Sequence, residues 1–259
     1  MSDDPLVLTR DEDRVRVITL NRPEVRNAFD IPLRVELIGA VEAAMADDGV
    51  RVLVLTGAGG AFCAGGDIAT MNPMTSDEAV SRAELTQRVV RTLWNGAKPV
   101  LAAVEGPAFG AGLSLALACD RIVAAVDARF GAAFARIGLA GDMGVLATLP
   151  ARLGPARASQ FLMFAEQVEA PRALTMGLID AMTDPGNAVA AALEDARKLA
   201  AGPPLALAAI KAAIGRYPLG RLETLDLEAE TQVAMFGSED FAEGVAAFRE
   251  RRRPDFRGR

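Results

Sequence analysis

Histidine is absent from the 259-residue sequence, and its absence excludes several kinds of catalytic site. Ser-His-Asp and Cys-His nucleophile pairs, histidine proton shuttles and histidine-ligated zinc all need an imidazole. No carboxylate cluster has the spacing of a metal-binding loop either, so we expect no metal site. Proton transfer must therefore fall to an Asp, Glu, Tyr, Cys or Lys side chain, or to water.

Cysteine, basic charge and long apolar runs are also scarce. Cys63 and Cys119 are the two cysteines, which make no disulfide framework. The net charge of −6 argues against a broad nucleic-acid surface. No apolar run approaches the roughly 18 residues that cross a bilayer, and the acidic residues 1–5 lack a signal-peptide pattern. We therefore expect a cytoplasmic protein with no nucleic-acid or membrane partner.

Apolar residues are plentiful, at 51% of the chain, and their pattern indicates an α/β fold. Strand-like runs near residues 15–20, 51–56, 99–104 and 121–126 are separated by helix-like segments. Past Pro185 every segment has a helical pattern. The expected division is an α/β core with the active site over residues 1–200 and a helical region over residues 201–259.

Two glycine-rich stretches follow buried strands, at residues 57–68 and 106–112. Glycine lets backbone approach backbone or ligand closely, and a helix that starts after such a turn leaves unpaired N–H groups with partial positive charge. These features suit a site for a developing oxyanion. A tight strand–helix junction packed with small residues is the alternative interpretation.

Four ordered motifs resemble the crotonase superfamily, also called the enoyl-CoA hydratase/isomerase family. They are the two glycine-rich stretches, Asn-Arg-Pro-Glu-Val-Arg-Asn-Ala-Phe at 21–29, and Glu-Gly-Val-Ala-Ala-Phe-Arg-Glu-Arg-Arg-Arg-Pro at 243–254. The resemblance covers nearly the whole chain. It implies a crotonase-like ββα spiral core with a C-terminal helical oligomerisation region, usually in trimers or dimers of trimers. It also implies an acyl-CoA thioester substrate and no tightly bound cofactor beyond the CoA of that substrate.

The resemblance further implies which groups act on the thioester. The backbone N–H groups of Ala64 and Ala111 match the family's oxyanion donors. The two glutamates that hold water in the hydratases are replaced by Ser114 and Phe134, which puts plain hydration in doubt. Asp142 matches an aspartate that dienoyl-CoA isomerases use as acid and base. A helix cap is the alternative role for this residue.

The remaining implied contacts concern CoA and the acyl chain. In the family, basic side chains near the motif at residues 21–29 contact phosphates, and the matching positions are Arg22 and Arg26. Backbone in the stretch at residues 57–68 holds adenine, at positions that match Gly65, Asp67 and Ile68. Apolar residues line the acyl pocket, and Met71 and Phe134 match these. Solvated arginines and ordinary core packing are the competing interpretations. Arg82 and Glu84, on a helix expected over residues 77–95, are interpreted as a solvated helix face, with a place in the acyl pocket as the alternative.

Double-bond isomerisation is the predicted activity, because moving a C=C bond needs one proton relay whereas hydration needs water held by two groups. Enoyl-CoA hydration remains an alternative. So does aryl-CoA dehalogenation or hydrolysis, in which Asp142 is the nucleophile but no histidine exists to activate water. A non-catalytic CoA-binding protein is the third alternative.

Overall fold

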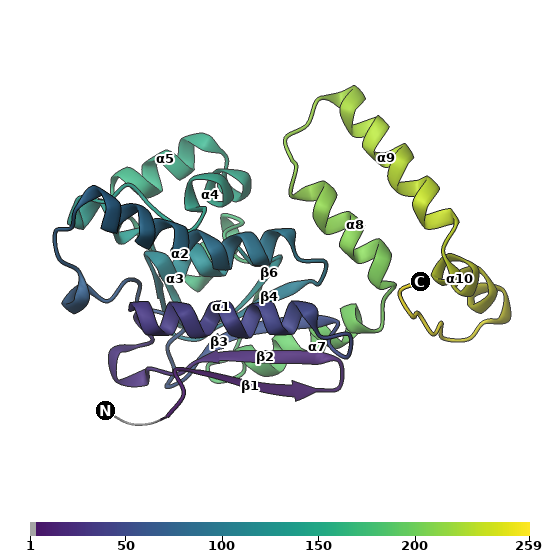
Figure 1. The fold of residues 1–259 in the computed structure, drawn as a ribbon, viewed down its shortest axis with the longest axis horizontal. Helices are drawn as coiled ribbons and strands as arrows, with labels where there is room; N and C mark the ends of the chain where they lie inside the picture. The colour runs from purple at the N-terminus through teal and green to yellow at the C-terminus, as the bar shows by residue number, and fades with distance from the viewer. Residues whose placement is uncertain (1–3) are drawn as a thin grey trace.

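A computed structural model describes residues 4–259 (Figure 1). Its main sheet has six strands in the order β1 (Val7–Glu12), β2 (Val15–Leu20), β3 (Val52–Gly57), β4 (Val100–Val104), β6 (Arg121–Ala125) and β9 (Ala181–Thr183). The β1–β2 pair is antiparallel and the others are parallel. Parallel neighbours need long crossovers, which the helices between them supply. The predicted α/β class is confirmed.

Alternating side chains of the inner strands β2, β3, β4 and β6 are buried on both faces of this sheet. In β3, Val52 and Val54 belong to a cluster with α7 (Ala188–Ala200), while Leu53 and Leu55 belong to the larger core on the opposite face. That opposite face carries α1 (Ile31–Ala46), on which α2 (Ser76–Asn95) packs. Burial on both sides explains why these strands read as continuous apolar runs.

A second, three-stranded sheet consists of β5 (Pro107–Phe109), β7 (Arg129–Gly131) and β8 (Gln167–Glu169). The sequence pattern did not predict β5 or β8, because three residues are too few to establish a period of two. Directly after β5 comes α3 (Ala111–Leu117), in which all seven residues are buried. This placement brings the start of α3 into the middle of the molecule.

The other helices belong either to the α/β core or to the C-terminal region beyond α7. Over the core lie α4 (Val145–Leu153), α5 (Pro155–Met163) and α6 (Ala170–Thr175), with short 3-10 turns at Pro23–Val25, Ile68–Thr70 and Ala133–Ile137. Beyond α7 follow α8 (Pro204–Ile214), α9 (Arg221–Phe236) and α10 (Glu239–Glu250), which extend away from the main sheet (Figure 1). Neither α8 nor α9 has a buried residue. Over residues 4–259, no helix combines the length and apolarity that crossing a membrane requires.

Candidate active site

A cavity of about 1010 Å³ lies between α2, the segment at residues 68–74 and the segment at residues 134–146. Its lining is largely apolar and includes Met71, Val90, Trp94 and Phe134. A large apolar cavity with a few converging polar groups is the usual form of a small-molecule site. Leu139 and Trp94 are 49% and 41% exposed, so they line this cavity rather than fill the core.

The two glycine-rich stretches run side by side next to this cavity. Cys63 N–H donates to Pro107 O at 3.0 Å, and Phe109 N–H donates to Cys63 O at 3.0 Å. Gly65 has a φ of +109°, and a Cβ at this position would lie 2.9 Å from Phe109 O. Only glycine meets both conditions without strain. The sequence therefore brings the backbone of residue 65 directly against the turn that leads into α3.

Ala111 is the first residue of α3, and within residues 4–259 its N–H has no hydrogen-bond acceptor. It therefore has the free donor that the sequence predicted. Ala64 does not, because its N–H donates to Arg26 O at 2.9 Å. The expectation that Ala64 supplies the second oxyanion donor is thus corrected: a backbone carbonyl already accepts that bond.

Gly66, two residues further on, has a free N–H. Gly66 forms a parallel bridge with Phe29, in which Gly65 O accepts from Phe29 N–H at 2.7 Å and Asp67 N–H donates to Phe29 O at 2.9 Å. The N–H of a bridged residue points to the side away from its partner. Among the described residues nothing accepts from Gly66 N–H. Gly66 and Ala111 are therefore the donors open to a ligand.

Asp142 lies in the segment before α4 and lines the cavity. The helix has Gly144 at its N-cap with no side-chain cap, and the buried Asp142 Oδ1 has no hydrogen-bond partner in the described structure. The alternative role of Asp142 as a helix cap is therefore excluded. Burial raises the pKa of the Asp142 carboxyl, and the charges of Arg34 and Arg82 act in the opposite direction.

Two arginines face this carboxyl from the helices that cover the sheet. Arg34 of α1 is 5% exposed and donates through Nη1 to Thr86 Oγ1, and Arg82 of α2 also lines the cavity. The interpretation of Arg82 as part of a solvated face was wrong, whereas Glu84 is exposed as expected. Burial and the neighbouring Arg82 charge lower the pKa of Arg34.

Arg34 was missed in the sequence, although a signal for it exists. It lies four residues before Ile38, on the apolar face of α1 that also carries Leu37 and Val41. A charged residue at such a position is either paired or functional, because an isolated buried charge is costly.

The positions of the missing glutamates hold no proton donor or acceptor for the cavity. Ser114 is fully buried, and its hydroxyl donates to Gly110 O at 3.2 Å within α3. Phe134 is 6% exposed and lines the cavity, with its ring 3.8 Å from where a Cβ of Gly110 would lie. Burial raises the pKa of the nearby Cys63 thiol to about 12, so it stays protonated at neutral pH.

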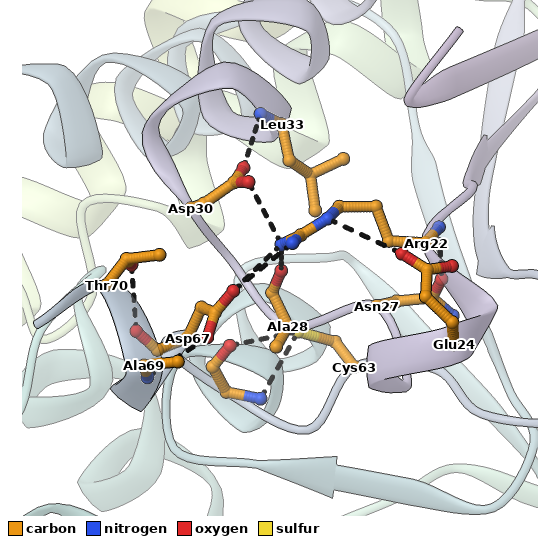
Figure 2. Close-up of polar contacts among 11 residues, drawn as sticks. Arg22, Glu24, Asn27, Ala28, Asp30, Leu33, Cys63, Asp67, Ala69 and Thr70 are labelled. Carbon is orange, nitrogen blue, oxygen red and sulfur yellow. Dashed lines mark hydrogen bonds and ion pairs between the residues drawn. The ribbon is translucent and has the colours of Figure 1, made fainter. Parts of the chain in front are cut away.

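Arg22 does not have the free guanidinium that a phosphate contact needs. Figure 2 shows it between two carboxylates: Nη1 lies 3.1 Å from Asp30 Oδ2, and Nη2 lies 3.2 Å from Asp67 Oδ2. Nη1 also donates to Ala28 O at 2.6 Å. Asp30 in turn caps α1 by accepting from Leu33 N–H at 2.9 Å. Arg22 and Asp67 therefore hold the motif at residues 21–29 to the stretch at residues 57–68, which corrects the phosphate contact expected of the Arg22 side chain. The backbone contact with adenine expected at Asp67 stays a prediction.

The other expected CoA and acyl contacts stay predictions. The Arg26 side chain is exposed. Ile68 is 66% exposed at the edge of the cavity. Met71 lines the cavity and packs on Gly66, where an added Cβ would come within 2.1 Å of Met71 Cε.

Replacing Arg22 with Met should lower the free energy of unfolding by about 3 kcal/mol, because two nearly buried carboxylates lose their common partner. Their side chains are 16% and 12% exposed. Urea unfolding followed by circular dichroism measures the effect. Arg26→Met is the matched control, since its exposed side chain should leave stability within about 0.5 kcal/mol. Equal midpoints for the two variants would contradict the structural role of Arg22.

Three comparisons with known proteins match nearly the whole chain to enoyl-CoA hydratases and isomerases. Residues 10–259 match the family model described as enoyl-CoA hydratase/isomerase. The chain is 38% identical to the 1,2-epoxyphenylacetyl-CoA isomerase of Escherichia coli, over 98% of each chain. It is 42% identical to a probable enoyl-CoA hydratase of Rhodobacter capsulatus, over 94% of each. Among solved structures, an enoyl-CoA hydratase from Polaromonas sp. superimposes with a TM-score of 0.91 at 35% identity, covering 96% of this chain and 99% of that one.

Proposed function

The chain belongs to the enoyl-CoA hydratase/isomerase family and has its crotonase fold, and we propose that this enzyme moves the double bond of an enoyl-CoA thioester with Asp142 as proton carrier. One observation supports this most. Of the described residues that line the cavity, Asp142 is the only one with a carboxylate. A single acid/base group is sufficient for isomerisation. Hydration needs two such groups, which hold and activate the water between them.

In the proposed mechanism, the thioester oxygen accepts hydrogen bonds from Gly66 N–H and Ala111 N–H. Charge that develops on this oxygen when the α-proton leaves is stabilised by these fixed donors, each worth about 2.7–4 kcal/mol in comparable sites. Asp142 takes the proton from one carbon of the acyl chain and returns it to another. Its raised pKa makes the carboxylate a stronger base for the α-proton than an exposed aspartate would be.

The test is a comparison of two substrates. A 3-enoyl-CoA should be converted to the 2-enoyl isomer, whereas a 2-enoyl-CoA should not gain water at a comparable rate. Faster hydration than isomerisation would overturn the proposal and favour the hydratase alternative. One relative has the name of that activity, the probable enoyl-CoA hydratase of Rhodobacter capsulatus. Dehalogenase chemistry has less support, because an ester on Asp142 would have no histidine to activate the water that releases it.

We place CoA at the cavity edge near Ile68, with the exposed Arg26 as the phosphate contact and backbone around Gly65 next to adenine. This orientation is supported by the free N–H groups of Gly66 and Ala111, at which we propose that the thioester oxygen binds. In this arrangement the nucleotide stays at the surface and the acyl chain enters the apolar cavity.

We further propose that residues 201–259 assemble the enzyme into homotrimers or dimers of trimers. An apolar stripe on α9 supports this, with Leu222, Leu225, Val233 and Phe236 between 57% and 76% exposed. A contiguous apolar surface of this kind is costly in water unless another chain covers it.

Leu222→Asp combined with Phe236→Asp should dissociate the assembly, because both carboxylates would have to be buried at the subunit contact. Sedimentation velocity at micromolar concentration measures the result. Ala234→Asp on the same helix is the control, since residue 234 lies away from the stripe. A wild-type protein that sediments as a monomer would refute the assembly.

A further inference from the structure

The cavity has a positive charge that the rest of the protein does not share. Its charged lining residues are Arg34, Arg82, Arg91 and Asp142, whereas the chain as a whole has a net charge of −6. Asp142 balances at most one of the three guanidinium groups, and it balances none while it is protonated. A site with this excess charge favours an anionic ligand group.

Two of these guanidinium groups have buried donors without acceptors. Arg34 Nε and Arg82 Nη2 lack any hydrogen-bond partner in the described part of the chain. The buried Asp142 Oδ1 is also without a partner there, although the charges of both arginines act on the Asp142 pKa. A buried charged donor without an acceptor is among the costlier features of a folded protein. Both donors are therefore open to a ligand oxygen.

We propose that Arg34 and Arg82 bind a carboxylate at the distal end of the substrate's acyl chain, so that the enzyme acts on ω-carboxyacyl-CoA thioesters. This inference rests on the function proposed above. The apolar lining accommodates the methylene groups, and the guanidinium forks match a carboxylate in shape and charge.

The two arginines are held on rigid elements, which supports a binding role. Arg34 comes from α1 and Arg82 from α2, and these helices pack against each other. Thr86 of α2 accepts from Arg34 Nη1 and donates to Arg82 O at 2.8 Å. The Arg34 guanidinium is therefore positioned before a ligand arrives, which reduces the entropy lost on binding.

A different role for the arginines would be to keep Asp142 ionised. In that case, their removal would shift the pH profile of the reaction, but the enzyme would not distinguish a carboxylate-ended chain from a methyl-ended one. Binding of unreactive thioesters separates the two roles, because it needs no proton transfer.

Isothermal titration calorimetry with saturated thioesters tests the proposal. Glutaryl-, adipyl- and suberyl-CoA are compared with pentanoyl-, hexanoyl- and octanoyl-CoA. At one or more lengths, the carboxylate-ended ligand should bind at least about tenfold more tightly, the effect of a charge-assisted hydrogen bond. Arg82→Met should abolish this preference, and Arg82→Lys should keep part of it. Arg88→Met, the same change at an exposed residue of α2 that pairs with Glu42 outside the cavity, should leave the preference unchanged.

The outcomes separate this inference from the function on which it rests. Equal or weaker binding of the carboxylate-ended ligands by the wild type at every length would overturn the inference. So would a preference that survives in Arg82→Met. Either result, with the methyl-ended thioesters still bound, leaves the proposed function intact. Failure of every thioester to bind would instead refute the proposed function.

Discussion

Asp142→Asn should lower the rate of 3-enoyl-CoA isomerisation by about 10²–10⁴-fold, the usual effect of losing a positioned acid/base. Asp142 is the only carboxylate among the described cavity residues, and the chain contains no histidine that could replace it. Asn keeps the size of the side chain, but its amide neither accepts nor releases a proton as a carboxyl group does. Affinity for a saturated acyl-CoA should stay near that of the wild type.

Two assays together measure this effect: conversion of 3-enoyl to 2-enoyl thioester, and exchange of the α-proton in D₂O. Glu84→Gln is the control, because Glu84 lies on α2 with an exposed side chain outside the cavity lining. It should keep full rate in both assays. If Asp142→Asn also kept full rate in both, Asp142 would not be the proton carrier.

The isomerisation rate should depend on pH through the Asp142 carboxyl, and it should fall at low pH. Burial holds its pKa above the ordinary aspartate value, so the base form disappears at a higher pH than for an exposed aspartate. The wild-type rate should therefore fall as pH is lowered through this raised pKa. A rate that stays constant down to the ordinary aspartate range would contradict this.

The same shift predicts how the substitution affects stability. The folded state binds the Asp142 proton more tightly than the unfolded chain, so stability is lost as pH rises from the ordinary pKa to the raised one. Asn carries no charge. Asp142→Asn should therefore unfold at the same or a higher urea concentration at neutral pH, with the difference disappearing at acidic pH.

Ala111→Pro should lower kcat by about 10²–10³-fold, because it removes one of the two backbone donors to the thioester oxygen. Residue 111 is the first of α3, a position at which the fixed φ of proline suits a helix. Its N–H bonds to no described residue, so no protein hydrogen bond is lost. Ala111→Gly, which retains the N–H, is the matched control and should keep most of the rate.

A structure with a bound acyl-CoA provides the direct test of the donors. The thioester oxygen should lie within hydrogen-bond distance, about 3.5 Å, of both Gly66 N and Ala111 N. It should not contact Ala64 N, whose hydrogen is donated to Arg26 O. Full activity of Ala111→Pro, or a thioester oxygen bound elsewhere, would contradict the arrangement.

The sequence alone predicted the features that depend on local pattern and composition. Val52 to Leu55 read as a strand because each side of a buried parallel strand must be apolar. The absence of histidine restricted proton transfer to a few side-chain types, and the family resemblance directed attention to Asp142 and Ala111. These conclusions need only residue types, their spacing and a resemblance between sequences.

Only the tertiary structure decided which polar groups are free to act, because their partners are distant in sequence. Ala64 loses its donor to Arg26, and Arg22 is held by Asp67, 45 residues away. Conversely, Arg34 and Arg82 retain unpaired donors inside the cavity, which local sequence does not show even for Arg34 on the apolar face of α1. Hydrogen bonding and burial depend on how distant segments pack, which local sequence patterns do not encode.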